Sequence, residues 1–267
     1  MRAVIPNEDI VYFGDTARLP YGSKSASTVT TFVRQIINYL RPHNPKHVVI
    51  ACNTATALAL PALRSEFADL SISGVIEPGS RAAVEACGAK ERPCMGVIAT
   101  EATVRSRAYE VAIHRRRHHA RVILRPTPLL VPIIEEGRDA RDPVVRLVLE
   151  QYLQPLIERQ LDVLLLGCTH YPLLKGLIAQ VAGETVRVID SAETCAEDVR
   201  RRLQSAGLLR GGEPREGRLQ CFVTDDSPRF ARLAAHFLGF AVAPPTWIAP
   251  DELYATTSAS QPLRQAG

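Results

Sequence analysis

DVLLLGCTH, residues 162–170, carries the strongest indication of the fold of this chain. Its unbroken run of Val and Leu is typical of a strand that is buried on both faces of a parallel sheet. Cys168 follows this run after one small residue, so its thiol is predicted at the carboxyl end of the strand, where open parallel sheets bind ligands. The stretch therefore predicts an α/β fold with a thiol at its ligand-binding edge.

A second stretch, HVVIACNT at residues 47–54, nearly repeats the first. An apolar run again leads through a small residue to a cysteine, Cys52, and a helix-like stretch follows. Two such thiols, one in each half of the chain, suggest a substrate that is held between two sulfurs. The repeated context also suggests two similar α/β domains that face each other across a cleft.

The composition bounds the class of protein. With 267 residues, 46% of them apolar, the chain can form one large or two modest globular domains. It has no apolar stretch long enough to span a bilayer and no signal peptide at its first residues, so we expect a cytoplasmic location and no membrane partner. Six cysteines without a CxxC spacing argue against a disulfide scaffold and a zinc site. Four of them are predicted to be small buried hydrophobic residues: Cys87, Cys94, Cys195 and Cys221.

The charge balance is mild, at a formal net charge of +4. The densest basic run, HRRRHH at residues 114–119, could contact nucleic acid. No aromatic residue interleaves with the run, and an exposed helix end or loop accounts for it. We therefore expect no nucleic-acid partner.

Short apolar runs alternate with longer amphipathic stretches along the chain, which predicts parallel sheets built from βαβ units. The predicted strands are residues 10–13, 48–51, 72–76, 95–99, 121–124, 163–166, 186–189 and 219–224. The predicted helices are residues 28–40, 54–67, 81–87, 104–113, 142–159, 171–181, 192–207 and 229–238.

This pattern predicts two doubly wound parallel-sheet domains that face each other across an active-site cleft. Pro78-Gly79 and Asp190-Ser191 interrupt the pattern, so we place the crossings between domains there. The first domain is then 1–79 plus 190–249, and the second is 80–189. Residues 250–267 are polar and lack an apolar period, and we expect a flexible tail.

The chemistry of paired thiols favours proton transfer. A thiolate is a competent base when its pKa is lowered, and the N-terminus of a helix lowers it. One sulfur on each side of a carbon lets a proton leave one face and return on the other, which inverts a stereocentre. A lone activated cysteine would instead indicate acyl transfer through a thioester, with His170 as its one obvious partner.

Four stretches of the chain together resemble the glutamate racemase family of bacteria, in the aspartate/glutamate racemase superfamily. They are YFGDTARLPYG at 12–22, IACNTA at 50–55, GVIEPG at 74–79 and LGCTHYPLL at 166–174. The similarity runs from Val4 to about Ile189 and more loosely beyond. The His of Cys-Thr-His favours the glutamate branch of the superfamily over aspartate racemase.

The resemblance implies a cofactor-independent isomerase that interconverts L- and D-glutamate and supplies D-glutamate for peptidoglycan. Cys52 and Cys168 match the two catalytic thiols, supported by His170 and by one of two neighbouring acids, Glu135 or Glu136. Asp15 and Arg18 are read as structural polar residues of a loop. The substrate-binding residues that the resemblance implies are Tyr21, Gly22, Asn53, Thr54, Thr169 and His170.

No cofactor is expected, because the sequence shows neither a dinucleotide fingerprint nor a phosphate-binding loop, and no lysine is marked as a Schiff base. L/D-glutamate is the expected ligand. The resemblance also implies a homodimer and, since some glutamate racemases restrain DNA gyrase, that enzyme as a protein partner.

Two alternatives stay open at this point. One is a racemase of another acidic amino acid such as aspartate. The other is an inactive remnant that binds a ligand or a partner, because the family begins with a strand and an Asp-Ser-Gly loop and this chain begins inside the helix that follows. We expect either a start that lies upstream or a less active product.

Overall fold

The computed structural model describes residues 1–211, 216–225, 228, 230–231, 234–235 and 242–258. The strands are β1 Ile10–Gly14, β2 Val48–Ile50, β3 Ile72–Gly74, β4 Cys94–Ala99, β5 Arg121–Pro126, β6 Val163–Gly167, β7 Arg187–Asp190, β8 Leu219–Val223 and β9 Thr246–Trp247. The α-helices are α1 Ala26–Leu40, α2 Asn53–Glu66, α3 Ile76–Ala86, α4 Glu101–Ser106, α5 Ala108–His114, α6 Leu130–Glu135, α7 Pro143–Ile157, α8 Lys175–Ala182, α9 Ser191–Ser205 and α11 Pro250–Ser258. Short 3₁₀ helices are η1 Thr16–Arg18, η2 Tyr21–Ser23, η3 Arg41–His43 and η4 Tyr171–Leu174.

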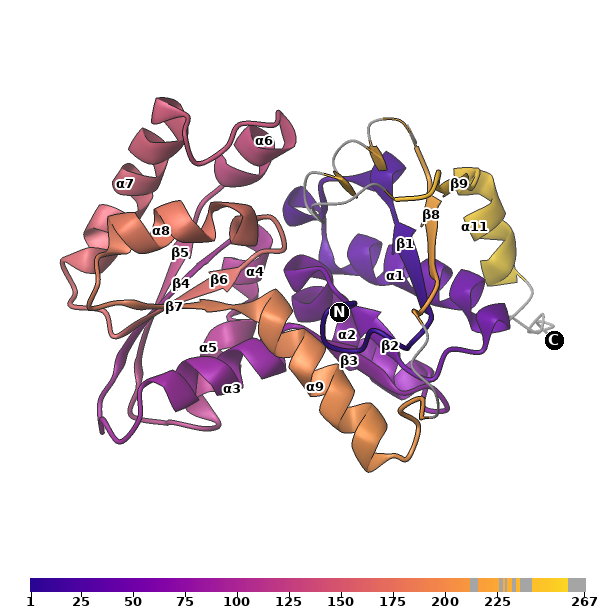
Figure 1. Ribbon diagram of the computed structural model, residues 1–267, viewed down its shortest axis with the longest axis horizontal. Coiled ribbons are helices and arrows are strands. Elements are labelled where there is room, and N and C mark those ends of the chain that lie inside the picture. Colours follow the sequence, from indigo (N-terminus) through magenta and orange to yellow (C-terminus); the bar gives the residue numbers. More distant parts are fainter. Residues whose placement is uncertain (212–215, 226–227, 229, 232–233, 236–241, 259–267) are drawn as a thin grey trace, which may run out of the picture.

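One half of the molecule is built on a four-stranded sheet in the order β5-β4-β6-β7, with every pair parallel. Helices α6, α7 and α8 cover one face of this sheet, and α3 and α5 cover the other (Figure 1). The run Val163–Leu166 is fully buried between the two helical layers, as its unbroken apolar sequence predicts. This half therefore has the doubly wound α/β architecture.

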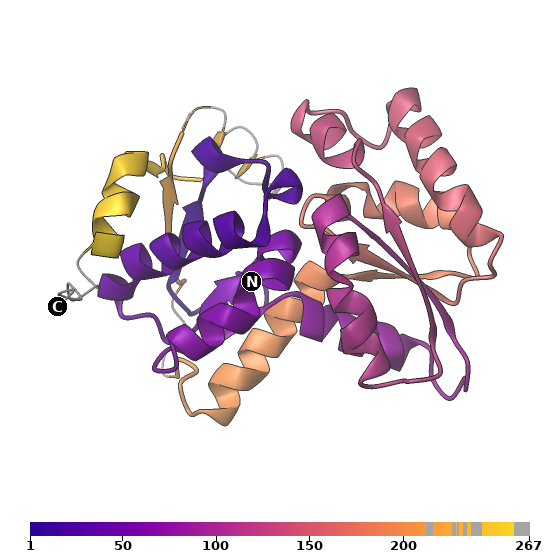
Figure 2. The same cartoon turned by 180° about the vertical axis from the view of Figure 1, so that it is seen from behind.

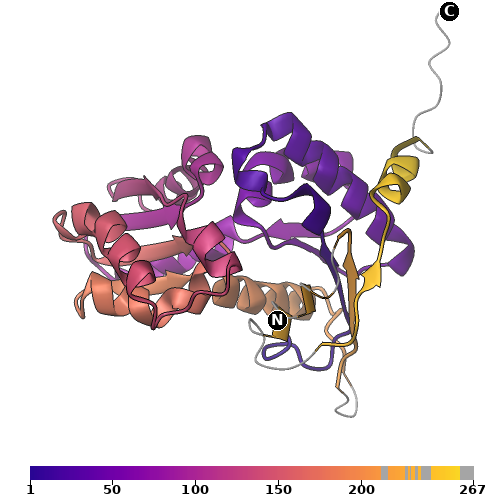
Figure 3. The same cartoon turned by 90° about the horizontal axis from the view of Figure 1, so that it is seen from above.

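The other half carries two smaller parallel sheets, β1-β8-β9 and β2-β3. Helices α1 and α2 pack together on one side, around Val29, Val33 and Leu63 (Figure 2). On the other side α9 buries Val199 and Leu203 against the segment around Ile5. The two halves lie side by side as separate lobes (Figure 3).

The chain passes between the halves through two helices, α3 and α9, which contact each other. The prediction that Pro78-Gly79 interrupts the secondary structure is wrong, because both residues lie in the first turns of α3. A proline is tolerated there, where its missing N–H has no helical partner. Gly79 allows the close crossing, since a Cβ at this position would stand 3.2 Å from Cβ of Ser191 on α9. The domain boundaries at residues 79 and 190 stay a prediction.

One further element differs from the sequence-based expectation, and another is not tested. The single helix expected over 104–113 is two helices, α4 and α5, because Arg107 between them has a positive φ of 53°. The helix expected over 229–238 lies largely outside the described residues.

The flexible tail expected from residue 250 is instead helical as far as Ser258, and residues 259–267 lie outside the described part of the chain. Leu253 of α11 is fully buried in a cluster with Phe222 and Ile248, and α11 lies along α1 (Figure 1). Residues 250–258 contain a single leucine, so the sequence carries little periodic signal for this helix. Within the described ranges, no helix combines the length and apolar character that crossing a membrane requires.

Candidate active site

Two cysteines lie at the carboxyl ends of strands in opposite halves of the molecule, as the sequence predicts. Cys52 follows β2 and is the N-cap residue of α2, and Cys168 follows β6 ahead of η4. The two thiols are close enough that charge on Cys52 raises the pKa of Cys168. The fold therefore brings together two sulfurs that are far apart in the sequence.

Burial dominates the acidity of both thiols. It raises the pKa of Cys168 to about 12, although the backbone N–H of His170 acts in the opposite direction. It also raises the pKa of Cys52, against the lowering effect of the backbone amides of Ala55 and Thr54 at the start of α2. At neutral pH, burial therefore favours the thiol over the thiolate at both sulfurs.

A histidine contacts the thiol of Cys168, and a carboxylate contacts the histidine. Nδ1 of His170 lies 3.7 Å from Sγ of Cys168, and Nε2 of the same ring lies 3.2 Å from Oε1 of Glu135. The structure thus separates the two acids that the sequence left open. Glu135, the last residue of α6, contacts His170, whereas the Glu136 side chain is 67% exposed and pairs with Arg138.

The polar residues after Cys52 connect the two halves. Asn53 is buried, and its Oδ1 accepts a hydrogen bond of 2.6 Å from the hydroxyl of Tyr109 in the other half. Its Nδ2 is also buried and has no hydrogen-bond partner within the described residues. An orphaned buried donor is costly, so this amide is well suited to receive a carboxylate of a ligand.

Thr54 makes the second connection between the halves. Its hydroxyl lies 2.9 Å from that of Thr100 and 3.2 Å from that of Thr103, at the start of α4. Three hydroxyls that contact one another can exchange donor and acceptor roles as a ligand requires. Thr169 is half-buried beside Cys168, and a hydrogen bond from its side chain lowers the pKa of that thiol.

Tyr21 and Gly22 lie at η2, on the first half's side of the contact with Thr100. The Tyr21 hydroxyl donates to Asp15, whose carboxylate also accepts from Nε of Arg18 at 2.8 Å. This buried pair fixes the tyrosine, in keeping with the structural role expected for Asp15 and Arg18. A Cβ on Gly22 would stand 3.2 Å from Cβ of Thr100, so glycine permits the close approach of the halves here.

Sequence reasoning missed Tyr109, Thr100 and Thr103. They lie in stretches without a motif and reach the site only because the two halves pack together, so no local signal could have found them. Searched over the described residues, the chain shows no group of three or more His, Cys, Asp or Glu side chains that could hold a metal ion.

A thiol from each half, with amide, hydroxyl and imidazole groups between them, defines a class of α/β proteins suited to proton transfer at a carbon. Residues 1–199 match the family model for Asp/Glu/Hydantoin racemase, and the chain belongs to this family.

Individual relatives agree with this assignment. A glutamate racemase of Geobacter metallireducens is 45% identical over 242 residues, which cover 88% of this chain and 85% of the relative. A crystal structure of a glutamate racemase isoform from Bacillus anthracis has a TM-score of 0.86 and 34% identity, over 93% of this chain and 91% of that one. The glutamate racemase of Francisella tularensis, in complex with D-glutamate, has a TM-score of 0.84 and 32% identity, over 93% and 90% of the two chains.

Proposed function

We propose that this chain is a glutamate racemase, which interconverts L- and D-glutamate by proton transfer between the substrate and two thiols. The observation that carries the proposal is the pairing of Cys52 and Cys168 at the carboxyl ends of strands in opposite halves. The similarity to proteins named glutamate racemase supports glutamate as the substrate.

The reaction needs one sulfur as a thiolate and the other as a thiol. The thiolate removes the proton on the α-carbon, and the opposite thiol gives its own proton to the other face, so the protein ends with the two states exchanged. Because burial raises the pKa of both thiols, the ammonium group of the bound amino acid is what favours the thiolate, as an opposite charge nearby does. His170, held by Glu135, hydrogen-bonds the Cys168 sulfur as it gains and loses its proton.

The groups around the thiols suit an amino acid with two carboxylates. The unpartnered Nδ2 of Asn53 and the amides at the start of α2 donate to one carboxylate. The hydroxyls of Thr54 and Thr169 and the backbone at Tyr21-Gly22 provide the remaining contacts in this proposal.

The test is the optical activity of glutamate in the presence of the purified chain. Circular dichroism should show L-glutamate and D-glutamate converging on the same racemic signal, and L-aspartate should show no comparable change. Cys52→Ser and Cys168→Ser should each abolish racemisation, because a hydroxyl is a far weaker acid than a thiol. The matched control is Cys87→Ser, which removes a thiol from the end of α3. Racemisation at the unaltered rate in either of the first two variants would contradict the two-thiol mechanism.

The proposal includes three further points. The chain divides into 1–79 with 190–249 and 80–189, the protein is cytoplasmic, and it forms a homodimer. Limited proteolysis tests the division, and analytical ultracentrifugation with and without glutamate tests the dimer.

A further inference from the structure

A basic hollow of about 560 Å³ lies at the amino ends of the strands of the four-stranded sheet, opposite the end that carries Cys168. Cys168 follows the carboxyl end of β6, whereas the hollow is lined from the loops at the amino ends of β4, β5 and β6. Its charged and polar lining consists of Lys90, Arg92, His119, Arg121, Arg159 and Gln160. Three segments far apart in the sequence each bring at least one cation to this place.

The charges of the three arginines in the hollow are not neutralised by carboxylates of the described residues. Arg92, Arg121 and Arg159 have no ion pair or side-chain hydrogen bond to any residue that the structure describes. Other arginines of the same half do have carboxylate partners, as Arg107 has Glu110 and Arg138 has Asp142. The hollow thus gathers three guanidinium groups that have no partner among the described residues, an arrangement that an anion would stabilise.

The backbone that carries these cations is held in place. The guanidinium of Arg117 donates to the carbonyl oxygens of Lys90, at 2.6 Å, and Gly88, at 2.8 Å. Asp162 accepts from Nζ of Lys90 at 2.7 Å and from the backbone N–H of Cys94 at 2.8 Å. An anion would therefore meet a partly organised site and would have few loops to order.

We infer that this hollow binds a small polyanion that carries two or more linked phosphate groups. Guanidinium groups donate in pairs to phosphate oxygens, and three of them match a ligand with several such oxygens. The volume is in the range of pockets for small molecules. The described residues that line it include no Phe, Tyr or Trp, so it offers no platform for stacked bases of a nucleic acid.

The test is isothermal titration calorimetry of the full chain with inorganic pyrophosphate at about 0.15 M salt, where weak surface attraction is screened. Arg92→Gln/Arg121→Gln/Arg159→Gln should weaken the binding of pyrophosphate at least about tenfold, since several charge-assisted hydrogen bonds are lost. The matched control, Arg105→Gln/Arg141→Gln/Arg146→Gln, removes the same charge from exposed arginines of the same half that pair with carboxylates. Its affinity should equal that of the unaltered chain.

Further titrations separate the sources of the phosphate groups. Comparable affinity for pyrophosphate and ATP would support the proposal and show that the phosphate groups alone are recognised. Tighter binding of ATP that is lost in the Arg92/Arg121/Arg159 variant would support the proposal and show that a nucleotide supplies the phosphate groups. Equal weakening in both triple variants would overturn it, as would the absence of pyrophosphate binding. Binding of double-stranded DNA without binding of pyrophosphate would also overturn it. Racemisation by the first triple variant should be unchanged in the absence of pyrophosphate, which separates this inference from the proposed function.

Discussion

The acidity of the two cysteines is a compromise between opposing effects. The amide groups at the start of α2 and at His170 favour the thiolates, but burial disfavours them more strongly. A base that stays protonated until its substrate arrives is protected from alkylation and oxidation, because these reactions need the thiolate. The ligand-free protein should therefore be slow to react with electrophiles at neutral pH.

This consequence can be measured at Cys168. Because its pKa is raised to about 12, its rate of reaction with iodoacetamide should rise about tenfold for each unit of pH between about 7 and 10. Mass spectrometry of the peptide that contains Cys168 gives the rate. At pH values above the pKa of Cys52, Cys52→Ser should speed the reaction, because the charge on the Cys52 thiolate is one of the causes of the raised pKa of Cys168. A plateau near pH 8 would show that the thiol is far more acidic than its burial implies.

Glu135 offers a second prediction at the residue scale. Glu135→Gln should lower kcat about 10- to 100-fold with little change in KM, because the imidazole of His170 loses the carboxylate that orients it. The charge of Glu135 also raises the pKa of Cys168, so the pH profile of kcat should shift toward lower pH. Steady-state kinetics over a range of pH measures both effects. Glu136→Gln is the matched control, since that side chain is exposed. Equal kinetics in the two variants would show that Glu135 has no role in the site.

Among the elements, α11 carries a prediction about stability. Leu253→Ala should lower the free energy of unfolding by about 2–4 kcal/mol, because the side chain is fully buried against Phe222 and Ile248. Leu147→Ala, in a leucine that is 65% exposed on α7, should change it by less than about 0.5 kcal/mol. Urea denaturation followed by circular dichroism compares the two. Equal stabilities would mean that residues 250–258 do not pack as α11.

The contrast between these elements explains what the sequence could predict. The positions of β6 and Cys168 could be predicted because all five residues of this strand are buried, which produces an unbroken apolar run in the sequence. Leu253 is the one buried hydrophobic residue among the described side chains of α11, residues 250–254, and a pattern needs several residues to be recognised. The choice between Glu135 and Glu136 depends on how α6 packs, and adjacent helical residues point in different directions. Local sequence thus predicts the strands and thiols but not the contacts that form when the halves meet.

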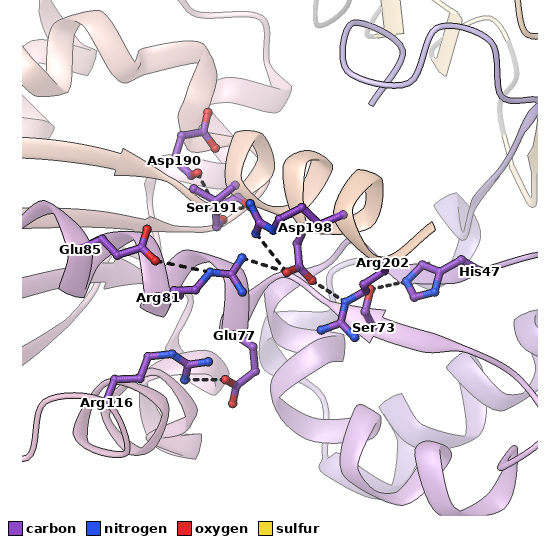
Figure 4. A network of polar contacts seen from close by, with 12 residues as sticks. His47, Ser73, Glu77, Arg81, Glu85, Arg116, Asp190, Ser191, Asp198 and Arg202 are labelled. Carbon is purple, nitrogen blue, oxygen red and sulfur yellow. Dashed lines mark hydrogen bonds and ion pairs between the residues drawn. The ribbon is translucent and has the colours of Figure 1, made fainter. Parts of the chain in front are cut away.

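At the scale of the molecule, the two crossings are joined by a polar network (Figure 4). Asp198 of α9 accepts from Arg81 of α3 at 2.9 Å and from Arg202 at 2.6 Å. Arg81 also reaches Glu85, and Arg116 of the neighbouring segment pairs with Glu77 (Figure 4). Because the site takes groups from both halves, the relative position of α3 and α9 bears on the distance between the two thiols.

Asp198→Asn should therefore destabilise the whole molecule by about 2 kcal/mol at pH 7, since a buried acceptor of charged hydrogen bonds loses its charge. Although burial alone raises the pKa of Asp198, the hydrogen bonds from Arg202 and Arg81 lower it overall below 3.8. A lowered pKa means that the carboxylate stabilises the fold above about pH 4 and that this contribution is lost as the pH falls through the folded-state value. Unfolding by urea at pH 7, 5 and 3 should thus show a difference in the free energy of unfolding between the unaltered chain and the variant, and this difference should shrink toward pH 3.

The control is the neighbouring Glu197→Gln, in a side chain that is 47% exposed, which should show almost no difference in the free energy of unfolding at any pH. A deficit of the Asp198 variant that stays constant with pH would mean that shape, rather than charge, holds the two crossings together.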